Sequence, residues 1–306
     1  MIKTMRANSL KNIVDVPPAP QAGADLDAVE HFMLRCIGLH SETSNALQDA
    51  LTNHFQAGGG RTRARLGLKA ADALLLAPRT AIALAAAAEL PHNASLIHDD
   101  LQDRSATRHG APALWVSCGE ETAICAGDLL ISGAYQALAR CEQPEQLAAL
   151  ITCMHERTAE VIHGQVADLN AQQSTIGLER YRAIAAAKSG PLLGLSTELA
   201  LLAAGYSEEA AKAAQAARDF AIAYQILDDL HDEWEDSAAS DGSACMNVIH
   251  LLRQAGDEHP HDTALQEAHR ALQRARLAAR SLPLGSGQPT LECIGLLAQQ
   301  LNDIQP

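Results

Sequence analysis

Apolar residues recur every three or four positions along most of the chain, which is the spacing of one face of an α-helix. Glycine, proline and serine clusters divide this pattern into segments, and no stretch alternates convincingly between apolar and polar residues as a half-buried strand does. The pattern therefore predicts an all-α fold. Helices are expected at residues 27–38, 41–56, 65–78, 79–102, 119–141, 144–170, 177–205, 207–235, 243–256, 261–281 and 289–303.

The start of the chain interrupts this pattern. Residues 1–24 contain three prolines within four positions and are expected to form a mobile leader, followed by one all-α domain at residues 25–306. No apolar run of the kind found in a secretion signal follows the basic N-terminus. The longest apolar region, Leu66 to Leu90, is interrupted by charged residues, so it indicates a buried helix pair rather than a membrane span.

Composition agrees with a helical, soluble protein. Hydrophobic residues make up 47% of the 306 positions but aromatic residues only 3%, and alanine and leucine dominate, which favours helices. The formal net charge of -14 argues against general nucleic-acid binding, because phosphate contacts need a basic face. The seven cysteines form no C-x-x-C pair, which indicates free thiols in a reducing compartment rather than disulfides or zinc ligands. We therefore expect a cytoplasmic protein without a transmembrane segment.

Two acidic motifs of the same spacing stand far apart in the sequence, each after an apolar helical stretch. Their aspartates occupy positions i, i+1 and i+4, namely Asp99, Asp100 and Asp103, and Asp228, Asp229 and Asp232. Helical residues four apart lie on one face, so each motif crowds carboxylates that repel one another unless a cation lies between them. Mg²⁺ binds through a few carboxylates together with substrate phosphates. The paired motifs therefore predict a magnesium site that takes a diphosphate.

Several cations stand where they can meet a phosphate. Arg108 follows the first acidic motif just before a turn signal, and a guanidinium can bind phosphate oxygens in pairs. The alternative for Arg104 and Arg108 is a role as cations at a helix C-terminus. Lys188 stands in an apolar helix, where its charge needs either Asp168 or a substrate phosphate as a partner. The arginines that follow the glycines at 58–60 are a weaker phosphate-binding signal.

The order of these motifs resembles that of the trans-isoprenyl diphosphate synthases, the polyprenyl synthetase family that includes farnesyl and geranylgeranyl diphosphate synthases, across about residues 26–300. The matching motifs are Gly-Gly-x-x-x-Arg at 58–63, Ser-Leu-Ile-His-Asp-Asp-x-x-Asp at 95–103, Arg-x-Gly-x-Pro at 108–112, Ala-Gly-Asp-Leu-Leu at 126–130, Gly-Gln-x-x-Asp at 164–168, Lys-Ser at 188–189 and Tyr-Gln-x-x-Asp-Asp-x-x-Asp at 224–232. The resemblance implies the class I isoprenoid synthase fold, a single-domain helical bundle around a central cavity, and a homodimer.

The resemblance also implies a reaction. Mg²⁺, three ions in the family, would clamp an allylic diphosphate whose C–O bond ionises, and isopentenyl diphosphate would attack the cation to give a longer trans-polyprenyl diphosphate. The candidate catalytic residues are Asp99, Asp100, Asp103, Lys188, Gln225 and Asp228. The candidate substrate-binding residues are Arg63, His92, Arg108, His109, Lys188, Ser189, Gln165 and Asp168. The candidate metal ligands are Asp99, Asp103, Asp228, Asp229 and Asp232.

The chain departs from the family pattern at the site of the second substrate. Gly60 and His109 stand where the family usually has lysine and arginine, and both normally hold the diphosphate of isopentenyl diphosphate. A histidine carries its charge only part of the time near neutral pH. Arg63 and His92 match the family pattern, and Arg61 is a candidate substitute for the missing lysine. The basic segment that commonly follows the second acidic motif is replaced by an acidic stretch.

These departures leave two alternatives to chain elongation open. The protein either ionises an allylic diphosphate and then cyclises or hydrolyses it, as a class I terpene synthase does, or it is a non-catalytic partner subunit. The ladder of Asp228, Asp232 and Asp236 favours the first alternative, whereas the scarcity of aromatic side chains to stabilise a cation opposes it. The retention of all aspartates in both motifs opposes the second alternative.

Product length is predicted from the helix that carries the first acidic motif. Ala94 and Ser95 are small, whereas short-chain family members often have aromatic residues there, so elongation should give a product of about C20 or more. Ala94→Phe should then shorten the product. The alternative is that Ala94 only lets two helices approach closely.

Overall fold

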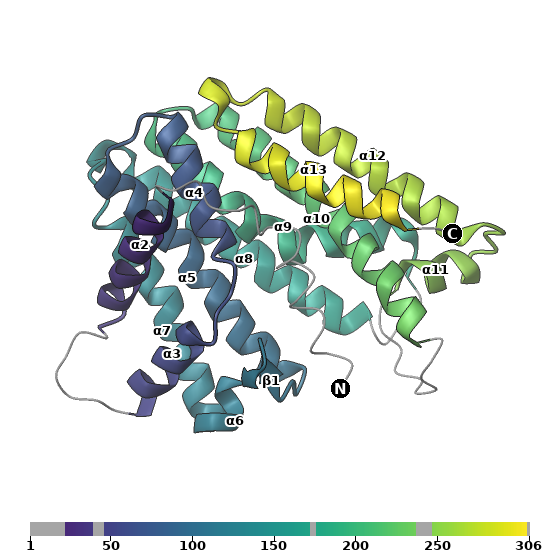
Figure 1. Ribbon diagram of the computed structural model, residues 1–306, viewed down its shortest axis with the longest axis horizontal. Coiled ribbons are helices and arrows are strands. Elements are labelled where there is room, and N and C mark those ends of the chain that lie inside the picture. Colours follow the sequence, from purple (N-terminus) through teal and green to yellow (C-terminus); the bar gives the residue numbers. More distant parts are fainter. Residues whose placement is uncertain (1–21, 39–45, 172–175, 237–246, 305–306) are drawn as a thin grey trace.

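The computed structural model describes residues 22–38, 46–171, 176–236 and 247–304, and long helices make up nearly all of this part of the chain (Figure 1). The helices are α2 (Ala22–Cys36), α3 (Ala46–Gln56), α4 (Thr62–Ala73), α5 (Pro78–Gln102), α6 (Leu114–Cys118), α7 (Glu120–Leu138), α8 (Leu147–Ala171), α9 (Leu178–Ala203), α10 (Ser207–Asp236), α11 (Val248–Gln254), α12 (Pro260–Arg280) and α13 (Gln288–Asp303). Short 3-10 turns cover Pro144–Gln146 and Pro283–Gly285. The all-α prediction is confirmed.

The structure differs from the sequence-based segments at a few places. A small antiparallel hairpin, β1 (Thr107–Arg108) with β2 (Ala111–Pro112), and the short helix α6 were not predicted, because two paired residues and one helical turn are too short to show periodicity. Helix α2 begins at Ala22, inside the predicted leader, and the rest of that leader lies outside the described residues. The predicted helix starts at 41 and 243 also lie outside them.

Two apolar clusters form the core. The first cluster includes residues of α2, α5 and α7 and of parts of α8 and α9, and it contains Met33, Leu84 and Leu130. The second joins the start of α9 to α10, α11, α12 and α13, and it contains Tyr181 and Phe220. Helices α5 and α10, which carry the acidic motifs, lie inside these clusters and are surrounded by other helices. The packing of their apolar residues in the core therefore fixes where the polar residues near their C-terminal ends lie.

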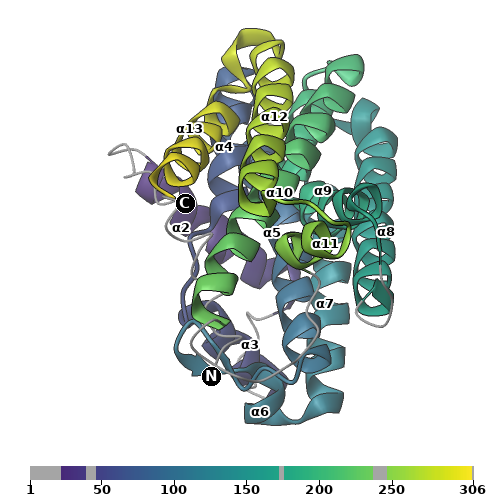
Figure 2. The ribbon, with the colours of Figure 1, turned by 90° about the vertical axis from the view of Figure 1, so that its right-hand side faces the viewer.

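The arrangement of the outer helices leaves those C-terminal ends at one end of the bundle. Figure 2 shows α12 and α13 covering one side of α10, and α8 packed against α9 at the edge of the bundle. Helices α3 and α6 lie together at the end of the bundle where Figure 1 shows the hairpin. None of the described helices is long and apolar enough to cross a bilayer. The six cysteines within the described residues are all free thiols, of which Cys125 is exposed.

Small residues bring the central helices into close contact. A Cβ atom added to Gly190 of α9 would lie 2.8 Å from the Cα atom of Arg218 in α10. One added to Gly164 of α8 would lie 2.7 Å from the carbonyl carbon of Ala187 in α9. Both distances are too short for real side chains, so glycine is required where these backbones cross. The alanine-rich sequence of α5 and α9 serves the same close packing.

We expect Gly190→Ala to lower the free energy of unfolding by about 1–3 kcal/mol, because the added methyl group must push α9 away from α10. Chemical denaturation with urea measures the change. Gly295→Ala is the matched control, since Gly295 lies within α13 with no atom inside 4 Å of the added Cβ. This control should be neutral or stabilise the protein by up to about 1 kcal/mol. Equal effects of the two substitutions would contradict the close crossing.

Candidate active site

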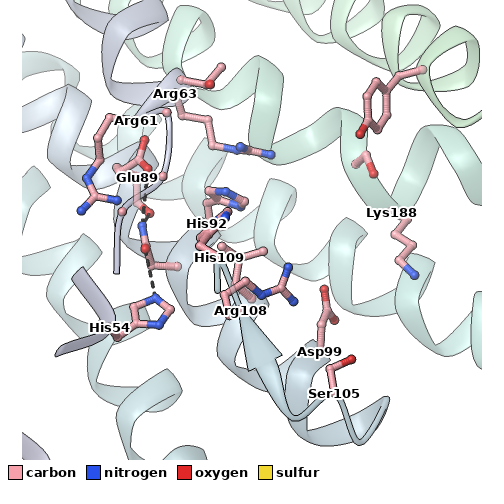
Figure 3. Close-up of a pocket in the computed structure, with 18 of the residues that line it drawn as sticks. His54, Arg61, Arg63, Glu89, His92, Asp99, Ser105, Arg108, His109 and Lys188 are labelled. Carbon is pink, nitrogen blue, oxygen red and sulfur yellow. Dashed lines mark hydrogen bonds between the residues drawn. The ribbon is translucent and has the colours of Figure 1, made fainter. Parts of the chain in front are cut away.

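A cavity of about 200 Å³ lies where the N-terminal end of α4, the C-terminal halves of α5 and α10, the hairpin and the middle of α9 meet (Figure 3). It brings together residues from motifs far apart in the sequence. The sequence-predicted site residues that line it are Arg63, His92, Asp99, Asp103, Arg108, His109, Lys188, Ser189, Gln225 and Asp228. The two acidic motifs therefore face one shared space, rather than separate surfaces.

One end of the cavity is acidic. Asp99 reaches it from the last turn of α5, Asp103 from the C-cap of that helix, and Asp228 from α10. Burial raises the pKa of Asp99 to about 6, and the neighbouring carboxylates of Asp103 and Asp100 add to this rise against the opposing effects of Lys188 and Arg108. A carboxylate in such surroundings gains stability from any added cation.

Lys188 of α9 is the cation that the structure places beside these carboxylates. Its Nζ donates a hydrogen bond of 2.6 Å to Oδ2 of the buried Asp168 on α8. Burial disfavours the charge on Lys188, but the carboxylates of Asp168, Asp99 and Asp103 outweigh that effect and raise its pKa. Asp168 thus provides the anion that the sequence required for this lysine. Asp168 itself does not line the cavity, and neither does Gln165, which bonds to Gln102 at 3.0 Å.

The hairpin positions Arg108 and His109. The chain leaves α5 through Arg104, which has a left-handed φ of 55°, and reverses at His109 and Gly110, both with positive φ as a two-residue hairpin turn requires. The guanidinium of Arg108 then reaches back to α5, where its Nη2 lies 2.5 Å from Oδ1 of Asp100 and its Nε lies 3.1 Å from the same oxygen. Asp100 therefore holds Arg108 at the cavity without lining the cavity itself.

The opposite end of the cavity is basic and rich in histidine. Arg63 of α4 points into it, and His92, His109 and His54 lie around it (Figure 3). Burial lowers the pKa of Arg63 to about 10, and its Nε atom is buried without a hydrogen-bond partner among the described residues. An unpartnered guanidinium donor directed into a cavity indicates an anion-binding position.

The backbone of this basic end is held by a buried carboxylate. Helix α4 has no side-chain cap of its own, and Oε2 of Glu89 on α5 accepts a hydrogen bond of 2.9 Å from the amide of Ala64 in the first turn. Glu89 is only 2% exposed, and its charge also complements the positive end of the helix dipole. This contact fixes the glycine segment and Arg63 relative to the helix of the first acidic motif.

Residues 44–250, about two thirds of the chain, match the polyprenyl synthetase family. The chain belongs to this family.

Individual relatives agree with that membership. The chain is 36% identical over 178 residues to the (2E,6E)-farnesyl diphosphate synthase of Mycobacterium tuberculosis, in a match that covers 58% of this chain but only 49% of that enzyme. It is 30% identical over 227 residues to the short chain isoprenyl diphosphate synthase of Methanothermobacter thermautotrophicus, covering 71% of this chain and 70% of that one. The match thus spans about half the length of the first relative and more of the second.

Solved structures of prenyl synthases have the same fold. The geranylgeranyl pyrophosphate synthetase of Pyrococcus horikoshii superimposes with a TM-score of 0.76 at 25% identity, over 92% of this chain and 97% of that one. That of Geoglobus acetivorans gives a TM-score of 0.76 at 24% identity, over 91% and 98% of the two chains. The predicted class I isoprenoid synthase fold is confirmed.

The adjacent aspartates of the second acidic motif in this chain point in different directions. Asp228 lines the cavity, whereas the adjacent Asp229 is turned into the protein and is 1% exposed. Its carboxylate accepts hydrogen bonds from Tyr181 Oη (2.7 Å), Gln225 Nε2 (2.8 Å) and the amide of Val248 (2.8 Å). Burial raises the pKa of Asp229 to about 7 despite these bonds. The structure thus places the predicted ligand Asp229 away from the cavity, in contact with α9 and α11.

Several other predicted residues also lie away from the cavity. Asp232 follows Asp228 by one turn of α10 without lining the cavity, and the side chain of Asp236 lies outside the described residues. Arg104 points outward, pairs with Glu120 and stacks over the ring of Trp115, which agrees with the alternative of a surface cation at the helix end.

The candidate substitute for the missing lysine is engaged elsewhere. Nε of Arg61 lies 2.6 Å from Oε1 of Glu30 on α2, and its Nη2 donates to the carbonyl of Phe55 at 2.9 Å. Figure 3 shows Arg61 directed away from Arg63. Arg61 borders the cavity but its guanidinium is directed to Glu30.

Sequence reasoning missed a connected set of polar residues at the basic end. His54 Nε2 lies 3.2 Å from Oδ1 of Asn93, and Nδ2 of Asn93 donates to the carbonyl of Glu89 at 2.8 Å. Glu89 gave a signal, since it is a lone acid in an alanine and leucine run, but nothing in the sequence around His54 distinguishes it.

Ala94, the predicted determinant of product length, is 1% exposed within the first apolar cluster and does not line the cavity.

We expect Asp229→Ala to lower the free energy of unfolding by about 3–5 kcal/mol, because it removes the buried carboxylate that accepts hydrogen bonds from Tyr181, Gln225 and the amide of Val248. Asp228→Ala is the matched comparison, and it should cost clearly less because that carboxylate borders the cavity beside other carboxylates. Urea denaturation of both variants measures the difference. A larger loss for Asp228→Ala would show that the two adjacent aspartates have the opposite roles.

Proposed function

We propose that the protein is a magnesium-dependent prenyltransferase that condenses an allylic diphosphate with isopentenyl diphosphate to a longer trans-polyprenyl diphosphate. The observation that carries this proposal is the division of one cavity into an acidic end, with Asp99, Asp103 and Asp228, and a basic end around Arg63 and His92. An acidic end suits a metal-bound diphosphate and a basic end suits a diphosphate bound without metal. Membership of the polyprenyl synthetase family supports the same reaction.

The acidic end fits Mg²⁺ in the chemistry of its donors. Asp99, Asp103 and Asp228 offer only carboxylate oxygens, which are the ligands that Mg²⁺ prefers. Within the described residues, no group of three or more histidine, cysteine, aspartate or glutamate side chains is close enough to hold a metal by itself. Oxygens of the substrate diphosphate would complete the coordination. The bound metal would neutralise the diphosphate as a leaving group, and three ions remain the expectation from the family.

The chain's own residues would support the leaving group and the cation. Lys188, held by Asp168, presents its remaining N–H donors beside Asp99, and Arg108 is oriented by Asp100. Both positive charges favour the departing diphosphate. Gln225 lines the cavity with its amide nitrogen bonded to Asp229, which leaves its carbonyl oxygen for the carbocation. This neutral oxygen and the hydroxyl of Ser189 stabilise a cation without becoming alkylated.

The basic end favours a reaction of two diphosphates over the alternatives. An enzyme that only ionises and cyclises or hydrolyses one allylic diphosphate needs no second anion site, yet Arg63 presents a buried, unpartnered Nε there. A non-catalytic subunit would need neither end. The expected order is ionisation at the acidic end, attack by the double bond of isopentenyl diphosphate, and loss of a proton to the departed diphosphate.

Three further expectations join this proposal. A homodimer remains the expectation from membership of the polyprenyl synthetase family. A cytoplasmic location and a product of about C20 or more also remain predictions. Because Ala94 is packed in the core, the larger side chain in Ala94→Phe can also destabilise the fold. Product length and stability of this variant should therefore be measured together.

The test is an assay with labelled farnesyl diphosphate and Mg²⁺, with and without isopentenyl diphosphate. We expect a longer product only when both substrates are present and none after chelation of the metal. Turnover of the allylic substrate alone would instead show a cyclase or hydrolase, and no turnover would show a non-catalytic subunit.

Asp99→Ala should reduce kcat at least 100-fold in that assay, because it removes a carboxylate from the metal end of the cavity. Asp72→Ala is its control, since Asp72 is an exposed carboxylate of α4 far along the chain from either motif. We expect kcat of this control to equal that of the unaltered protein. An Asp99→Ala variant with undiminished kcat would remove the acidic end from the mechanism.

A further inference from the structure

The basic end of the cavity has little permanent positive charge available for a ligand. The guanidinium of Arg61 is engaged by Glu30 and Phe55, and two donor atoms of Arg108 are engaged by Asp100. Arg63 is the arginine at this end whose Nε lacks a partner among the described residues. A diphosphate carries two or three negative charges at neutral pH, so Arg63 alone does not balance it.

Three histidines from three different elements line this end beside Arg63. They are His54 of α3, His92 of α5 and His109 of the hairpin turn (Figure 3). The backbone at Gly59 lies between the side chains of Arg61 and His109. A Cβ atom added to Gly59 would lie 3.2 Å from Nη1 of Arg61 and 3.8 Å from Nε2 of His109. Gly60 and His109, which stand in the sequence where the family pattern has lysine and arginine, line this same end of the cavity.

The hydrogen bonds around His54 define which nitrogen can accept a proton. Nδ2 of Asn93 donates to the carbonyl of Glu89 at 2.8 Å, which leaves Oδ1 of Asn93 as the acceptor toward His54. Nε2 of His54, 3.2 Å away, must therefore carry a hydrogen. The other nitrogen, Nδ1, has a lone pair in the neutral ring and is the atom that a proton would occupy.

The surroundings keep two of these rings neutral when no anion is bound. Burial lowers the pKa of His54 to about 4, and Arg61, Arg108 and His109 oppose its protonation further, against the effect of the bond to Asn93. Burial likewise holds the pKa of His92 well below its ordinary value, helped by Arg63, Arg108, Arg61 and His54. Glu89 is an acidic residue on α5, the helix that carries His92, and its carboxylate accepts a hydrogen bond from the amide of Ala64 in the first turn of α4.

We propose that His54, His92 and His109 form a protonatable anion site, and that the second diphosphate binds at Arg63 with uptake of one or more protons from solvent onto these histidines. His54 is thereby a substrate-binding residue. The inference rests on the proposed function for the identity of the ligand. Each negative charge placed 4–5 Å from a ring at an effective dielectric constant near 20 favours the protonated form by roughly 100-fold or more, which is sufficient to charge a ring that is neutral in the empty cavity.

Linkage gives this site a distinctive pH dependence. For each proton taken up on binding, the affinity falls about tenfold for each rise of one pH unit over the range in which the uptake is complete. Permanent cations at positions 60 and 109 would give affinities without that dependence. The affinity for the second substrate should therefore weaken as pH rises above 7, whereas the same change should not weaken binding of the metal-bound allylic diphosphate.

The test is isothermal titration calorimetry of the whole protein with isopentenyl diphosphate in EDTA, at pH 7.5 in two buffers of different ionisation enthalpy. The difference in heat gives the number of protons taken up, which we expect to be about one or more. His54→Gln and His109→Arg should each reduce that number, because glutamine cannot be protonated and arginine is already charged. His250→Gln, an exposed histidine of α11, is the control and should leave it unchanged.

The outcomes separate this inference from the proposed function. Binding without proton uptake, or uptake that both variants leave unchanged, overturns the protonatable site while leaving a condensation reaction possible. Proton-linked binding in a protein that makes no elongated product supports the site and overturns the proposed reaction. Absence of binding by the folded protein overturns both. Because His109→Arg adds a cation, it should also bind isopentenyl diphosphate more tightly at pH 8.5, which a loss of folding would not produce.

Discussion

Repulsion between carboxylates that face one cavity is the constraint on which the rest of this structure depends. Asp99 and Asp103 reach the cavity from α5 and Asp228 from α10, and burial in this company raises the pKa of Asp99 to about 6. Lys188 compensates only part of the charge, since Asp168 also shares it. Such an arrangement is unfavourable by itself and would become favourable if cations entered with a diphosphate, as we propose. The fold thus maintains a charge imbalance that the proposed complex would relieve.

In each motif, one of two adjacent aspartates holds the elements around the cavity in place. Neighbouring residues on a helix point about 100° apart, so the first and second carboxylates of a motif cannot face the same space. In α5 the second one, Asp100, anchors Arg108 and the hairpin. In α10 the second one, Asp229, anchors Tyr181 of α9 and Val248 of α11. In both motifs one carboxylate faces the cavity while its neighbour fixes the wall of that cavity.

The sequence was sufficient to predict the helices and most of the cavity lining, because helical periodicity and motif spacing are local properties. It predicted Asp99 and Asp103, without Asp100, as metal ligands, and both line the cavity. It also placed Asp100 among the catalytic residues and Asp229 among the metal ligands, because the direction of each side chain depends on which helix packs against it. Arg61 was predicted as a substitute cation, but Glu30 on α2 engages it, a contact set by tertiary packing. His54 was missed for the same reason, because only the packing of α3 against α5 brings it to Asn93.

The most direct test of the shared metal and diphosphate site is the binding of Mn²⁺, as a spectroscopic substitute for Mg²⁺, measured with and without inorganic pyrophosphate. Asp99→Ala, Asp228→Ala and the double variant should be compared by electron paramagnetic resonance. We expect tight metal binding only with pyrophosphate, and a loss in each single variant nearly as large as in the double variant. Metal binding that does not need pyrophosphate, or losses that simply add, would contradict a single site built from both helices.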